Sequence, residues 1–160
     1  MIGFDFKQLI NNFSQKGQVL WIGVRPGKHM PIKSVIAVNV LENKIEGDHY
    51  NGNILSKRHV TLIQQEHIDV VASLMAKEVS PEQLRRNIVV KGLNLLALKD
   101  KKFQIGEAIF EMTGLCHPCS KMEKNLGVGG YNAMRGHGGI TARIIKGGLI
   151  RLGDAVTPIS

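Results

Sequence analysis

The sequence has few aromatic residues, few cysteines and no long apolar run, and each shortage excludes a class of protein. Aromatic side chains make up 5% of the 160 residues, so the stacking residues of a single-strand or RNA-binding platform are mostly missing. The longest apolar stretches, such as residues 34–41, are far shorter than the roughly 20 residues that cross a bilayer. We therefore expect a chain that does not span a membrane.

The N-terminus does not resemble a secretory signal, because Asp5 and other polar residues interrupt its apolar residues. The expected compartment is the cytoplasm. A chain of 160 residues fits one domain, and no repeat or Ser- or Pro-rich linker divides it. We expect a single domain over residues 1–160.

The chain is basic, with 21 Lys and Arg against 13 Asp and Glu and a formal net charge of +8. Such a balance suits nucleic acid, an anionic cofactor or an acidic partner. The basic residues are scattered from Lys7 to Arg151, and this scatter disfavours nucleic acid. A basic nucleic-acid-binding module is kept as an alternative of a different class.

The hydrophobic pattern predicts a mainly β fold with a few helices. A short amphipathic helix is expected within residues 1–17, where four apolar residues recur at helical spacing: Phe6, Leu9, Ile10 and Phe13. A second helix is expected over residues 66–77, and Ser80-Pro81 marks the start of a third. Short strands are predicted over residues 19–24, 34–41, 58–63, 87–91, 102–105 and 108–113, with two or three more over 140–159. Many short strands with glycine corners indicate a closed β-barrel with flanking helices.

The two cysteines form one motif, Cys116-His117-Pro118-Cys119. It is compatible with a redox pair, with half of a zinc site that His49, His117 or His137 would have to complete, or with one working thiol. A thioredoxin-like pair needs alternating strands and helices, which this chain lacks. Cys119 follows a predicted strand, and His117 and Lys121 nearby in the sequence could hold its thiol as a thiolate. We favour a functional Cys119 over two buried structural cysteines.

Two further segments are candidates for binding. Residues 127–139 are rich in glycine, and their amides, with Arg135 and His137, could bind a phosphate or another oxyanion. A flexible surface loop is the equal alternative. The segment Glu46-Gly47-Asp48-His49 could be an acid–base or metal site, or a turn that Asp48 fixes by bonding to nearby amides. We expect this acidic turn to line the same pocket as Cys119.

These motifs occur in an order that resembles the MOSC domain family, named for the C-terminal domain of molybdenum cofactor sulfurase. The resemblance covers residues 34–159. It is carried by the 46–49 segment, by Arg58 before a strand, by Arg85-Arg86-Asn87-Ile88, and above all by Pro118-Cys119. Members often have Arg-Glu-Asn where this chain has Arg85-Arg86-Asn87, which puts an acid role at this position in doubt.

The resemblance implies a closed barrel like the pyruvate kinase β-barrel, with the family's cysteine at Cys119. Some members bind the molybdenum cofactor with this thiolate as a metal ligand and reduce N-hydroxylated compounds. Others are thought to carry a persulfide received from a pyridoxal-phosphate-dependent cysteine desulfurase. The resemblance places Arg58, Arg85 and Asn87 near the pterin or its phosphate, and we add Asp48, His49, Arg135 and His137 as candidate cofactor-binding residues. Asp48 would bond to Arg58 or to pterin N–H groups, and Cys116 is a secondary candidate that could resolve a persulfide or only pack.

The predicted function is therefore that of a molybdenum-cofactor-binding protein that reduces N-hydroxylated small molecules. No flavin, haem or iron–sulfur motif is evident, so a separate reductase would supply electrons. The alternative is a sulfur carrier with a persulfide on Cys119 and no bound cofactor. We expect a monomer or homodimer.

Overall fold

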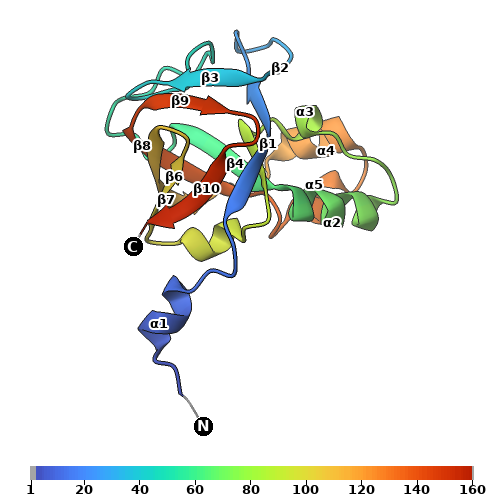
Figure 1. The fold of residues 1–160 in the computed structure, drawn as a ribbon. Coiled ribbons are helices and arrows are strands. Elements are labelled where there is room, and N and C mark those ends of the chain that lie inside the picture. The colour runs from blue at the N-terminus through green and yellow to red at the C-terminus, as the bar shows by residue number, and fades with distance from the viewer. Residues whose placement is uncertain (1–2, 160) are drawn as a thin grey trace.

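The computed structural model describes residues 3–159 and is built around a barrel of seven strands (Figure 1). The barrel closes because β10 pairs with β6 on one side and with β1 on the other. Neighbours pair antiparallel except β4 and β5, which are parallel. In order around the barrel the strands are β1 (Gly17–Val24), β5 (Ile88–Lys91), β4 (Val60–Gln64), β8 (Ile140–Lys146), β7 (Ala108–Leu115), β6 (Lys102–Ile105) and β10 (Ala155–Ile159).

Three short strands lie outside the closed ring. Strand β2 (Lys33–Val35) pairs with the end of β1, and β3 (Ala37–Val40) forms a separate two-stranded sheet with β9 (Gly148–Arg151). The sequence predicted one strand over residues 34–41, and this prediction is wrong. The chain bends at Ile36, so its two halves pair with different partners.

The helices cover one side of the barrel. Figure 1 shows α2 (Gln65–Met75), α3 (Pro81–Leu84), α4 (Ser120–Leu126) and α5 (Gly130–Met134) grouped beside β1 and β4. The 3-10 helix η1 (Leu95–Leu98) follows β5, and α1 (Phe6–Asn11) stands away from the barrel. Among residues 3–159, no helix has the length and apolar character that a bilayer crossing requires.

Alternating side chains on β1, β5 and β4 divide the core into two clusters. Ile22, Leu62 and Ile88 point into the barrel, whereas the neighbouring residues Ile63 and Val89 point outward. The outward residues pack, together with half-buried Trp21, against apolar side chains of the helices: Ile68, Val71, Met122, Leu126 and Met134. Because burial of such side chains stabilises the fold by about 1.5–3 kcal/mol each, the helices are fixed on this face.

The N-terminal helix is shorter than predicted. It has a capping box between Asp5 and Gln8, but it ends at Asn11 and leaves Phe13 outside. Phe13 packs against the barrel core, which explains its apolar character without a place on a helical face. The capping box at Ser80 is present as predicted and starts α3.

Candidate functional site

Three strand ends bring polar and basic side chains together at one end of the barrel. Arg25 directly follows β1, Asn87 directly precedes β5, and Arg58 lies two residues before β4. Because β1 runs antiparallel to β5 and β5 runs parallel to β4, these positions share one end of the barrel. The helices that cover Ile63 and Val89 do not cover this end, so a cavity remains.

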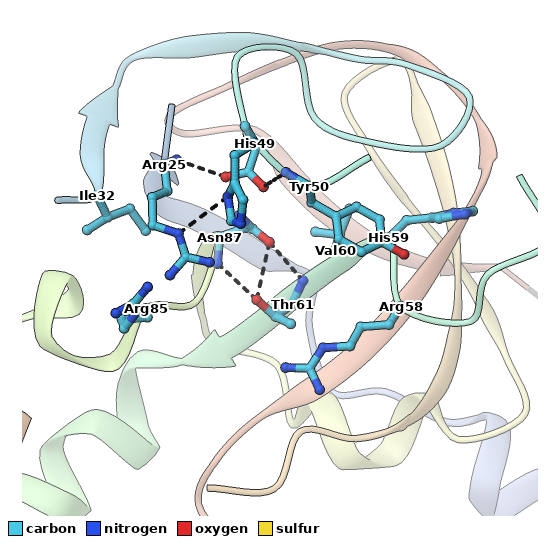
Figure 2. A pocket seen from close by; sticks show the side chains of 11 residues that line it. Arg25, Ile32, His49, Tyr50, Arg58, His59, Val60, Thr61, Arg85 and Asn87 are labelled. Atoms are coloured by element: carbon cyan, nitrogen blue, oxygen red, sulfur yellow. Dashed lines mark hydrogen bonds between the residues drawn. The ribbon is translucent and has the colours of Figure 1, made fainter. Parts of the chain in front are cut away.

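The cavity has a volume of about 140 Å³. Figure 2 shows its lining side chains, which come from segments far apart in the sequence. They are Arg25, Ile32, Asp48, His49, Tyr50, Arg58, His59, Val60, Thr61, Arg85 and Asn87. Five of the seven residues predicted to bind a cofactor are therefore gathered here: Asp48, His49, Arg58, Arg85 and Asn87.

Asn87 and Thr61 form the rigid floor of this cavity. The Asn87 Oδ1 atom accepts from the Thr61 amide at 3.1 Å and from the Thr61 hydroxyl at 3.2 Å. The Asn87 Nδ2 atom donates to the Gly23 carbonyl at 3.3 Å, so one side chain joins β4, the start of β5 and β1. These internal bonds give Asn87 a positioning role, and its Nδ2 atom has a second N–H that they do not use.

Asp48 fixes the loop that forms another wall. Its carboxylate accepts from the backbone amide of Arg25 at 2.8 Å and from that of Tyr50 at 3.3 Å. Burial raises the pKa of Asp48 above its usual value, although the bond from Tyr50 and the nearby His49 act in the opposite direction. Among residues 3–159, the hydrogen bonds to this carboxylate come from backbone amides and none comes from Arg58. These contacts agree with the alternative in which Asp48 fixes the turn.

Three guanidinium groups surround the remaining space (Figure 2). Arg25 Nε donates to His49 Nδ1 at 3.4 Å. The Arg85 Nη2 atom is buried and has no hydrogen-bond partner among residues 3–159. Since one carboxylate faces three guanidinium groups, the cavity is suited to an anion.

Arg25 is the functional candidate that the sequence prediction missed. Its only local marker is its place between a predicted strand and the Pro26-Gly27 loop. The same marker occurs at many strand ends with no function. Arg25 becomes recognisable as a site residue only when the sheet places it opposite Arg58 and Arg85.

The two cysteines have different environments. Cys116 is buried, with its Sγ atom 3.6 Å from Nη2 of Arg58, whereas Cys119 is exposed and stands at the N-cap position of α4 without a capping bond from its side chain. No hydrogen-bonded turn or bend occurs from Cys116 to Cys119. Pro118 also favours an extended conformation at His117. Three extended steps span about 10 Å between Cα atoms, more than the roughly 7 Å that a disulfide tolerates.

Arg86 holds the start of this cysteine segment. Its buried guanidinium donates to three backbone carbonyls, those of Gly138 at 2.8 Å, Leu84 at 3.0 Å and Cys116 at 3.3 Å. Burial lowers the pKa of Arg86, and the thiols of Cys116 and Cys119 act in the opposite direction. The guanidinium group of Arg86 is thus a structural tie between α3, the cysteine segment and the residues before β8.

The glycine-rich segment does not join the cavity. Its amides at Gly129 and Tyr131 each donate to the carboxylate of Glu123 at 3.0 Å, so a side chain of the protein occupies the predicted anion position. These bonds lower the pKa of Glu123. The segment also contains α5 and is not simply a flexible loop.

Arg135 and His137 are likewise outside the cavity lining. Arg135 is exposed, and His137 packs edge-on against His67 with 5.3 Å between ring centroids. Among residues 3–159, no three His, Cys, Asp or Glu side chains gather as a potential metal site. The structure therefore brings neither residue to the cavity and offers no ligand set there for the zinc alternative.

Comparison with known proteins identifies both a family and a fold. The sequence profile described as "MOSC domain" matches residues 43–157. The YuaD protein of Bacillus subtilis superimposes with a TM-score of 0.77 at 17% identity, covering 90% of this chain and 96% of that one. YiiM of Escherichia coli superimposes with a TM-score of 0.69 at 20% identity, covering 91% of this chain and 70% of that one. YiiM of Geobacillus stearothermophilus superimposes with a TM-score of 0.73 at 16% identity, covering 90% of this chain and 75% of that one. No curated protein matches in sequence.

Proposed function

The chain belongs to the MOSC domain family, and from this premise we propose that it binds the molybdenum cofactor and reduces N-hydroxylated small molecules. Electrons would come from a separate reductase. The observation that carries the proposal is the cavity with three guanidinium groups, one of which has a buried Nη2 atom with no partner in residues 3–159. Burying such a donor unpaired is costly, so an anionic ligand that pairs with it is favoured.

The residues present fit one end of the cofactor. A volume of about 140 Å³ is below the roughly 300 Å³ of typical ligand pockets, so the cavity would hold the phosphate end and leave the rest outside. Arg25, Arg58 and Arg85 would neutralise the phosphate, and Thr61 and Asn87 would keep the floor rigid. Cys119 is the proposed metal ligand, because a thiolate is a soft donor. When bound, the cofactor would supply the two-electron chemistry.

A sulfur carrier is the second candidate, with a persulfide on Cys119 and a cysteine desulfurase as its partner. The exposure of Cys119 favours it, since a donor enzyme must reach the thiol. In either case we propose that the protein acts in the cytoplasm.

Analysis of the gently purified full-length protein separates these functions. The cofactor proposal expects molybdenum and pterin in the wild type, both decreased in Arg85→Gln and retained in the exposed control Arg135→Ala. Cyanide-labile sulfur without molybdenum would favour the sulfur carrier. Salt-dependent binding of DNA or RNA without either would favour the nucleic-acid module.

A further inference from the structure

Two neighbouring segments, the chain that leads to Cys119 and the loop before β4, combine exposed apolar residues with positive charge. Leu115, at the end of β7, is 51% exposed, and Leu55, in the loop before β4, is 76% exposed. The Thr113 hydroxyl donates to the carbonyl of Lys57, which holds this loop against the end of β7. The two leucines therefore belong to neighbouring segments, each two residues from this contact.

The same two segments carry only positive charge. Residues 51–58 and 112–122 contain the exposed cations Lys57, Arg58 and Lys121, together with exposed His117, and no Asp or Glu. The next acidic residue, Glu123, is bonded to the amides of Gly129 and Tyr131. We call the surface formed by Leu55, Lys57, Leu115, His117 and Lys121 the thiol rim.

We propose that the thiol rim is the docking surface for a protein partner with an acidic face, which presents its reactive group to Cys119. This inference rests on the proposed function, because the reductase must approach the metal that Cys119 would hold, and the desulfurase must approach the thiol itself. Exposed apolar side chains surrounded by charge are typical of a protein interface. The basic charge would attract an acidic partner and speed its association.

Nucleic acid is a poorer fit to these residues. The rim has no Phe, Tyr or Trp side chain on which bases could stack. Its two leucines would face the charged phosphate backbone without benefit. An acidic protein, in contrast, could cover the leucines and pair with the cations in one contact.

The test measures protection of Cys119, with oxidised flavodoxin as an acidic protein probe. Iodoacetamide is neutral and should alkylate exposed Cys119 in preference to buried Cys116. At low salt, saturating flavodoxin should slow alkylation of the full-length protein about tenfold, and high salt should remove this protection. Lys57→Glu/Lys121→Glu should lose the protection at low salt, and Leu55→Gln/Leu115→Gln should weaken it.

The matched control is Lys99→Glu/Lys102→Glu, which changes the same charge at exposed positions elsewhere. This variant should remain protected. The proposal would be overturned if flavodoxin gave no protection, or if the control variant lost protection as fully as Lys57→Glu/Lys121→Glu. Stronger protection by an RNA oligonucleotide or by anionic vesicles would also overturn it. Binding of the oxidised probe needs no molybdenum. Protection in cofactor-free protein would therefore support the docking surface even where the cofactor proposal had failed.

Discussion

The guanidinium group of Arg58 lines the cationic cavity and lies 3.6 Å from Sγ of buried Cys116. This contact connects the cavity to the segment that ends at Cys119, the N-cap of α4. The main chain of the same segment is held by Arg86 through the Cys116 carbonyl. Arg58 thus joins the cavity to the cysteine segment, whereas Arg86 fixes the main chain at the start of that segment.

The two thiols should respond differently to substitution. Cys119→Ser should abolish molybdenum retention or persulfide formation, because the exposed thiol is the proposed ligand or sulfur carrier. Cys116→Ser should reduce retention only partly, since it changes a buried contact of Arg58. Molybdenum and sulfane-sulfur content of the purified variants measures both effects. Equal loss in the two variants would contradict this assignment.

Arg85→Gln should weaken phosphate binding without loss of stability. The buried Nη2 atom of Arg85 has no partner within residues 3–159, so removal breaks no internal bond of that atom. Loss of one charge-assisted bond should lower the affinity for inorganic phosphate by about 1–3 kcal/mol. Titration calorimetry gives the affinity, and Arg135→Ala, outside the cavity, should match the wild type. Phosphate binding as tight in Arg85→Gln as in the wild type would remove Arg85 from the site.

Arg86→Met should destabilise the fold, in contrast to its neighbour. It leaves three buried carbonyls without their donor, which should reduce the free energy of unfolding by about 3 kcal/mol or more. Arg86→Lys should restore only part of this, because an ammonium group cannot reproduce the planar geometry. Urea denaturation gives the values. Similar urea midpoints for Arg86→Met and Arg85→Gln would show that the bonds from Arg86 to the three carbonyls contribute little to stability.

Glu123→Gln should lower the melting temperature near neutral pH. The pKa of Glu123 is lowered in the folded state by the amides of Tyr131 and Gly129, so its ionised form favours folding. This contribution is complete above the unfolded pKa, about 4.3, and is lost as the pH falls through the lower folded value. The difference in melting temperature between wild type and variant should therefore shrink below about pH 4. A difference that stays constant from pH 7 to pH 3 would refute this.

Asp48→Asn should lower the melting temperature more clearly than it lowers cofactor loading of the folded fraction. The Asp48 carboxylate accepts from the Arg25 amide with one oxygen and from the Tyr50 amide with the other. An Asn side chain has only one acceptor oxygen, so one of these two bonds is lost. The expected loss is about 1 kcal/mol in the free energy of unfolding. An unchanged melting temperature with decreased loading would instead make Asp48 a ligand-binding residue.

Local sequence was enough to predict features that depend on neighbouring residues. The capping box at Ser80, the short strands and the loop position of Cys119 follow from turn chemistry and side-chain period, which act within a few residues. The motif order also gave the family and the closed barrel. Five of the candidate residues lie in one cavity, whereas Cys119, which was expected to share a pocket with Asp48, is not among the residues that line it.

Long-range packing decided the rest. Arg25 has a local sequence context that many solvent-exposed arginines share, and only the tertiary structure places it in one cavity with Arg58 and Arg85. The glycines at 127–139 were compatible with an external anion until Glu123 was found on their amides. The role of Arg86 likewise depends on the Gly138 carbonyl, 52 residues away. Sequence determines which groups are available for bonding, whereas the fold decides which partner each one meets, because these partners are distant in the chain.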